Sequence, residues 1–131
     1  MLQELQTIQD FLEEPLSDDP YIVEQRGAEL SVYMARSGKI FADATAEYKK
    51  ALNSEIVDVI LPQMAKAAGA SYTVQNMLAK SACHEKEQVA LWAERIHKTC
   101  VRQLDWCRSV LSKAKEQMRI DSYATSHIAH D

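Results

Sequence analysis

The sequence contains few of the residues that end regular secondary structure. Three glycines and three prolines occur in 131 residues, and a β-sandwich or β-barrel needs many more turns than these residues can supply. No apolar stretch approaches the roughly 18 residues of a membrane-spanning helix, and the opening residues Met1–Glu4 contain no basic residue of the kind that begins a secretory signal. These absences favour an all-α protein that stays in the cytoplasm and does not bind membranes.

Cysteine is also scarce, and it occurs in an odd number. Cys83, Cys100 and Cys107 form no Cys-x-x-Cys pair, which predicts reduced thiols in an intracellular protein. The rest of the composition, 47% hydrophobic and 26% charged residues, is typical of a soluble globular chain. We therefore interpret residues 1–131 as a single all-α domain.

The few breaks that do occur divide the chain into helices. Pro15 ends an acidic amphipathic helix, and Asp19-Pro20 supplies the cap and the first turn of a long helix. Pro62 predicts a kink in that helix, and Gly69 predicts a turn after it. The expected organisation is an acidic N-terminal helix and linker (1–19), a first long helix (20–68), a turn and short helix (69–84), a second long helix (85–120) and a flexible tail (121–131).

Each long helix carries a stripe of apolar and small residues in alternating steps of four and three, the heptad pattern of coiled coils. The first stripe comprises Val23, Gly27, Leu30, Met34, Ser37, Phe41, Ala44, Tyr48 and Ala51. The second comprises Ala90, Ala93, His97, Cys100, Leu104, Cys107, Leu111, Ala114 and Met118. Two such helices joined by one bend predict a long antiparallel, coiled-coil-like hairpin.

The second long helix has a further apolar side. Its members are Val89, Trp92, Ile96, Trp106 and Val110. A two-helix hairpin covers only one stripe on each helix, so this side needs another partner. We therefore expect a homo-oligomeric helical bundle.

One cluster on the second long helix has the spacing of metal ligands. Glu94-x-x-His97 is half of the motif of di-iron bundles, and His97 with Cys100 is half of a zinc site. Cys83 and Cys107 lie too far along the helix to complete the zinc site, and a di-iron site needs a second copy of the motif and two further glutamates. No phosphate-binding loop, His-Glu-x-x-His motif or nucleophile elbow occurs. We expect no metal, no cofactor and no enzymatic activity, and a metal or thiol site at this cluster is the third-ranked hypothesis.

A strip of aromatic and basic residues follows another face of the same helix, namely Trp92, Arg95, Lys98, Arg102 and Trp106. If it were bare, it would suit nucleic acid or protein, because indoles stack on bases and guanidinium groups bind phosphates. The favoured interpretation is that the acidic helix 2–14, or a second subunit, covers the indoles while acidic side chains bind the arginines. Those acidic residues are Glu4, Asp10, Glu13 and Glu14.

Charge is unevenly distributed, although the net charge is only −4. Residues 1–20 carry six acidic and no basic side chains, whereas residues 80–119 carry nine basic and five acidic ones. The basic helix supports an alternative function as a nucleic-acid-associated factor in DNA replication, recombination or packaging, with further phosphate contacts from Arg108, Lys115 and Arg119. The acidic net charge and the division of the basic residues between two helix faces disfavour that alternative.

Three segments carry a resemblance to a known group of proteins. They are the helix end Arg108–Met118, the turn Gly69–Thr73 and the small-residue stretch Leu78-Ala79-Lys80. Over residues 69–119 the chain resembles small uncharacterised helical-hairpin proteins encoded by tailed bacteriophages. The resemblance implies a virus-encoded accessory protein in the host cytoplasm, with no catalytic residues to transfer. The leading hypothesis is thus a non-enzymatic interaction or assembly protein.

Overall fold

The computed structural model describes residues 1–64 and 72–129, and within these ranges every regular element is helical. This confirms the all-α prediction. The elements in chain order are α1 (Leu2–Leu12), α2 (Pro20–Ser54), the π-helix η1 (Glu55–Ile60), α3 (Leu61–Met64), α4 (Tyr72–Ala82) and α5 (His84–Ala129). None of the described helices combines the length and the apolarity needed to cross a bilayer.

The start of α2 follows from its capping residue. The Asp19 side chain accepts a hydrogen bond from the backbone N–H of Tyr21 at 3.0 Å, and Pro20 occupies the first helical position, where a missing N–H leaves no hydrogen bond unmade. The helix then runs for 35 residues. The predicted helix start is confirmed.

The region of Pro62 differs from the prediction of a simple kink. The six residues before Leu61 form a π-helix, which widens the turn directly ahead of the proline. The proline ring crowds the carbonyl four residues earlier and supplies no N–H to it, so a wider turn relieves the clash. The predicted helix end at residue 68 and the turn at residues 69–71 lie outside the described residues.

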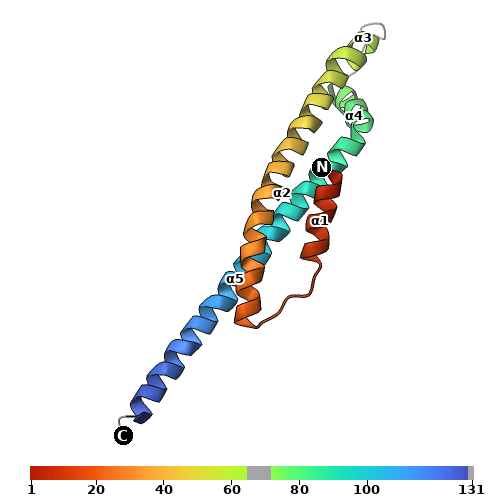
Figure 1. Cartoon of the computed structure of the whole chain (residues 1–131). Helices are drawn as coiled ribbons and strands as arrows, with labels where there is room; N and C mark the ends of the chain where they lie inside the picture. Colours follow the sequence, from red (N-terminus) through yellow and green to blue (C-terminus); the bar gives the residue numbers. More distant parts are fainter. Residues whose placement is uncertain (65–71, 130–131) are drawn as a thin grey trace.

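The two long helices run antiparallel along one another, and α1 lies beside them, next to α5 (Figure 1). The predicted stripes form the contact: Val23, Leu30 and Ala44 of α2 are buried, as are Cys100 and Cys107 of α5. Small residues in the contact allow α2 and α5 to lie close together. A Cβ added to Gly38 would lie 3.2 Å from Cε1 of His97.

Helix α1 completes the core as a third layer over part of this pair. Its buried residues are Leu5, Ile8, Phe11 and Leu12, which lie on one face of the helix, whereas Leu2 is exposed. The core is therefore built from three helices of the same chain, not from two.

The tail of the chain does not match the expectation for residues 121–131. Helix α5 continues through this region to Ala129 and is 46 residues long. No glycine or proline occurs after Gly69, so nothing in the backbone stops a helix that packing has already nucleated. The side chains described beyond Ala114 are all exposed.

Candidate functional site

The aromatic and basic strip of α5 lies partly under α1. The indole N–H of Trp92 donates a hydrogen bond to Oε1 of Gln9, and the half-buried ring packs against the core. Leu12 and Glu13 border the same hollow as Trp92. Of the two partners considered for this indole, it is the chain's own N-terminal helix that lies over it.

Trp106 is covered less completely than Trp92. It is 36% exposed and borders a hollow formed with the linker between α1 and α2, including Pro15 and Leu16, and with Ile22 of α2. The strip therefore has one indole under α1 and one at the edge of the linker.

The acidic side chains of α1 do not bind the arginines of this strip, contrary to the expectation. Glu4 pairs with Arg36 at 2.6 Å, and Glu14 pairs with Arg26 at 3.5 Å, and both arginines belong to α2. The hydrogen bond from Arg36 lowers the pKa of the Glu4 carboxyl. Helix α1 lies in the groove between α2 and α5, so its carboxylates reach α2.

The other two acidic residues of α1 form contacts within the helix. Asp10 accepts from the side chain of Gln6 at 2.8 Å, and Glu13 accepts from the side chain of Gln9 at 3.0 Å. Both are i,i+4 contacts on the exposed face. The prediction that the four N-terminal acidic side chains bind the arginines of α5 is therefore wrong for each of them.

Arg26 is the residue that joins α1 to both long helices, and sequence analysis missed it. Its guanidinium donates to the backbone carbonyls of Phe11 at 3.0 Å and Glu14 at 3.4 Å, and to the side-chain oxygen of Gln103 at 3.0 Å. The guanidinium carbon also lies 4.2 Å from the centroid of the Phe11 ring. The side chain of Arg26 is only 10% exposed.

The guanidinium of Arg26 supplies hydrogen-bond donors to backbone carbonyls at the end of α1. The last carbonyls of a helix have no partner within the helix and carry a partial negative charge, which a cation stabilises. Gln103 extends the same arrangement by donating to the carbonyl of Leu12 at 3.0 Å. A usable signal was present in the sequence, because Arg26 is the only Lys or Arg among the first 35 residues.

The basic residues of the strip face away from α1. Arg95, Lys98 and Arg102 border an open surface hollow together with Thr99. Lys98 pairs with Glu94 at 2.6 Å, whereas Arg95 and Arg102 form no ion pair with any residue that the structure describes. These two guanidinium groups are the free cations of the strip.

The second basic group lies further along α5. Arg108 pairs with Asp105 at 3.6 Å, and Arg119 pairs with Glu116 at 2.6 Å. Lys115 has no ion-pair partner within residues 1–64 and 72–129. Of the three candidate phosphate contacts, two therefore belong to ion pairs between exposed side chains, which water screens, and one is an open ammonium group.

Glu94, His97 and Cys100 do not converge on one point. Glu94 is engaged by Lys98, while Nδ1 of His97 lies 3.1 Å from Oγ of Ser37 on α2. The same hydroxyl lies 3.1 Å from the carbonyl of Met34 and 3.8 Å from Sγ of Cys100. No cluster of three or more potential metal ligands occurs among the described residues.

The hydroxyl and the thiol of this group are closed off from solvent. Ser37 and Cys100 have no exposed surface, and burial raises the pKa of the Cys100 thiol. A nucleophile needs access to its substrate and an activating base. The arrangement instead connects α2 to α5 through a polar contact in the core between the Ser37 hydroxyl and Nδ1 of His97.

Comparison of the chain with family models, with curated proteins and with solved structures found no match.

Proposed function

We propose that this protein is a non-enzymatic helical interaction protein that assembles with further copies of itself. One observation carries the proposal: the 46-residue helix α5 is covered by α1 and α2 over only part of its length (Figure 1). Large apolar side chains remain in contact with water on several elements, namely Tyr21 (70%), Val32 (63%), Met77 (66%) and Met118 (69%). Such side chains lose contact with water when another protein surface packs on them, which favours association.

The placement of the reactive side chains supports a role without catalysis. Ser37 and Cys100 lie in the core, and within the described residues neither borders the hollows around Cys83, Arg95 and Trp92. Enzyme sites combine an enclosed apolar pocket with a few converging polar groups.

Self-association is tested by the mass of the particle in solution. Multi-angle light scattering at tens of micromolar should give at least twice the chain mass of 14.8 kDa, because the apolar surface is covered only when copies meet. A mass of one chain across that concentration range would overturn the proposal.

A second candidate function is supported by the two free guanidinium groups of α5. Arg95 and Arg102 lie two turns apart on an exposed face with Lys98 near them, which suits the phosphates of a nucleic acid strand. Trp92 is half-buried and bonded to Gln9, so it offers little surface for stacking. Single-stranded DNA binding that weakens and loses salt dependence in Arg95→Ala with Arg102→Ala would favour this function over assembly.

The resemblance to phage-encoded helical hairpins adds a biological setting to the proposal. On that resemblance, the protein would assemble in the cytoplasm of an infected bacterium. The genes on either side of this one test that setting, because phage accessory genes lie among other phage genes.

A further inference from the structure

A small hollow lies where the linker between α1 and α2 passes α5. It measures about 200 Å³, and its exposed apolar walls come from three parts of the chain, namely Pro15 and Leu16 of the linker, Ile22 of α2 and Trp106 of α5. The hollow is thus formed by segments that are far apart in sequence.

The apolar walls of this hollow stay in contact with water. Leu16 is 44% exposed, Ile22 is 48% exposed and Trp106 is 36% exposed, whereas Phe11, which borders the same hollow, is buried in the core. Removal of apolar surface from water is favourable. An apolar side chain that entered the hollow would therefore displace water from three exposed side chains.

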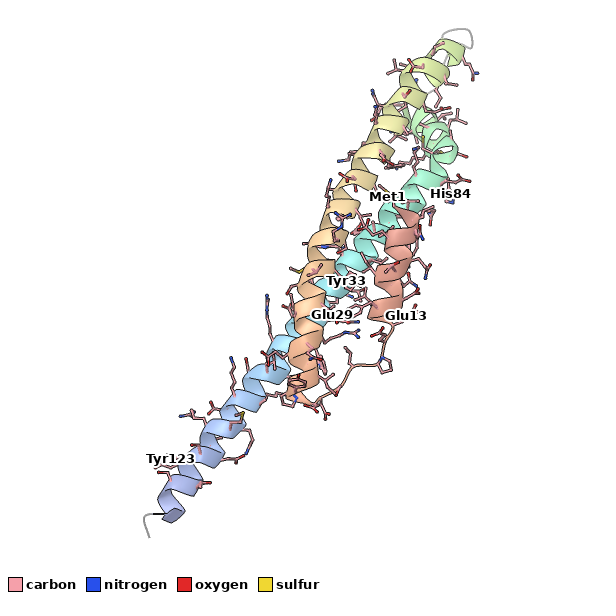
Figure 2. The ribbon with its side chains drawn as sticks, in the orientation of Figure 1. Met1, Glu13, Glu29, Tyr33, His84 and Tyr123 are labelled. Carbon is pink, nitrogen blue, oxygen red and sulfur yellow. The ribbon has the colours of Figure 1, made fainter. Side chains whose placement is uncertain are left out.

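Acidic side chains surround these walls. Glu14 and Glu29 border the hollow, and the linker residues 13–19 contain four acidic and no basic side chains. Figure 2 shows Glu29 on α2 and Glu13 at the end of α1, where the linker begins. The Glu14 side chain is 63% exposed, and Glu29 forms no ion pair with any residue in the described ranges 1–64 and 72–129. These carboxylates attract cations and repel anions.

The neighbouring basic side chains do not cancel this charge. Arg26 borders the hollow, but its guanidinium donates to backbone carbonyls at the end of α1 and to Gln103. Arg102 lies one turn before Trp106 and borders a different hollow of α5. The two glutamates therefore outnumber the one arginine that borders the apolar walls.

The size of the hollow favours a single side chain as its occupant. At about 200 Å³ it is smaller than the roughly 300–1,000 Å³ of pockets that enclose small-molecule ligands. A peptide can place one anchoring side chain in such a hollow while its flanking residues lie on the surface around it.

We propose that this hollow, here called the linker hollow, binds a basic segment of a different protein. One apolar side chain of that segment enters between Leu16, Ile22 and Trp106, and flanking Lys or Arg side chains pair with Glu14 and Glu29. Both kinds of contact are needed, because water screens ion pairs between exposed side chains. The phosphates of a nucleic acid would meet the same carboxylates and be repelled. The inference goes beyond self-association, since the partner is another protein.

The test uses fluorescein-labelled hexapeptides with two lysines at each end and every pairing of Leu, Ile, Phe and Trp in the middle. Fluorescence anisotropy with the full chain measures their dissociation constants. We expect the tightest of them to bind at least fivefold more tightly than matched peptides with two serines in the middle or with glutamates in place of the lysines. Absence of binding by every apolar basic peptide up to millimolar concentration would overturn the proposal.

Two pairs of substitutions locate the binding. Glu29→Lys reverses a charge at the hollow, while Glu24→Lys makes the same change at an exposed residue of α2 outside it. Leu16→Ser removes an apolar wall, while Val32→Ser removes an apolar side chain that is 63% exposed on α2 outside the hollow. All four side chains are exposed, so far-UV circular dichroism should show unchanged helix content.

We expect the dissociation constant of the tightest peptide to rise at least fivefold in Glu29→Lys and in Leu16→Ser, and to stay within twofold in Glu24→Lys and Val32→Ser. Equal effects within each pair would show that the peptide binds the acidic surface in general, and would overturn the linker hollow. A lower particle mass in Glu29→Lys and Leu16→Ser would assign the hollow to a contact between copies and overturn it as well. Hollow-dependent binding by a monomeric chain would support the linker hollow while contradicting self-association.

Discussion

Arg26 combines several stabilising contacts in one side chain. It neutralises the end of α1, stacks on Phe11 and bonds to Gln103 of α5. An exposed arginine contributes little to stability because water screens its ion pairs, but Arg26 is nearly buried and donates to backbone carbonyls at and just after the end of α1. A single residue of α2 thereby contacts both α1 and α5.

We expect Arg26→Met to lower the free energy of unfolding by about 1.5–3 kcal/mol, because the charge-assisted hydrogen bonds from its guanidinium to Phe11, Glu14 and Gln103 are lost. Urea denaturation measures the change. Arg36→Met is the matched control, since it removes an ion pair between two exposed side chains, and its transition should stay close to that of the unaltered chain. An equal decrease in the free energy of unfolding in both variants would contradict the proposed effect of burial at Arg26.

At the scale of the element, α1 behaves as a cover over the groove between α2 and α5. It reaches that groove by an exposed linker and holds its place by four apolar side chains and by the contacts of Trp92 and Arg26. A helix of 11 residues is only marginally stable in water on its own. Its order therefore depends on the surface beneath it.

Detaching α1 should expose Trp92. In a Trp106→Phe background, where Trp92 is the sole indole, Ile8→Asp buries a charge at a residue that is 1% exposed. We expect the fluorescence emission to shift to the red and stability to fall. Thr7→Asp, one residue earlier on the exposed face, should leave the emission unchanged. An unshifted emission in Ile8→Asp would mean that α1 does not shield the indole.

At the scale of the whole molecule, burial links stability to pH. Burial raises the pKa of the Cys100 and Cys107 thiols, and burial together with the hydrogen bond to Glu87 raises the pKa of Tyr48. The unfolded chain titrates at ordinary values, about 8.5 for cysteine and about 10 for tyrosine. It therefore loses these protons at lower pH than the folded chain does.

The free energy of unfolding should consequently be constant near neutral pH and decrease as the pH rises above about 8.5, because unfolding then releases protons. Urea denaturation between pH 7 and pH 10 measures the slope. The double variant Cys100→Ala with Cys107→Ala should have a smaller slope, although cavities lower its stability at every pH. A free energy of unfolding that does not fall over this range would contradict the assignment.

Part of the candidate site could be predicted from the sequence, and part could not. The strip from Trp92 to Trp106 and the cover by the N-terminal helix were both predictable, because helical periodicity places residues on a common face. The partners of the acidic residues were not. Whether Glu4 meets Arg36 or Arg95 depends on the groove in which α1 lies, and periodicity within a helix carries no information about that choice.

Properties that depend on neighbours along the chain could be predicted without the structure. The heptad stripes, the start of α2 at Asp19 and Pro20, and the helical class follow from spacing, capping and the scarcity of glycine and proline. Only the tertiary structure decided that Arg26 closes α1, that His97 meets Ser37, and that α5 continues as a helix past the body of the molecule. These outcomes depend on contacts between residues far apart in sequence, and on packing that nucleates a helix whose tail has no stripe of its own.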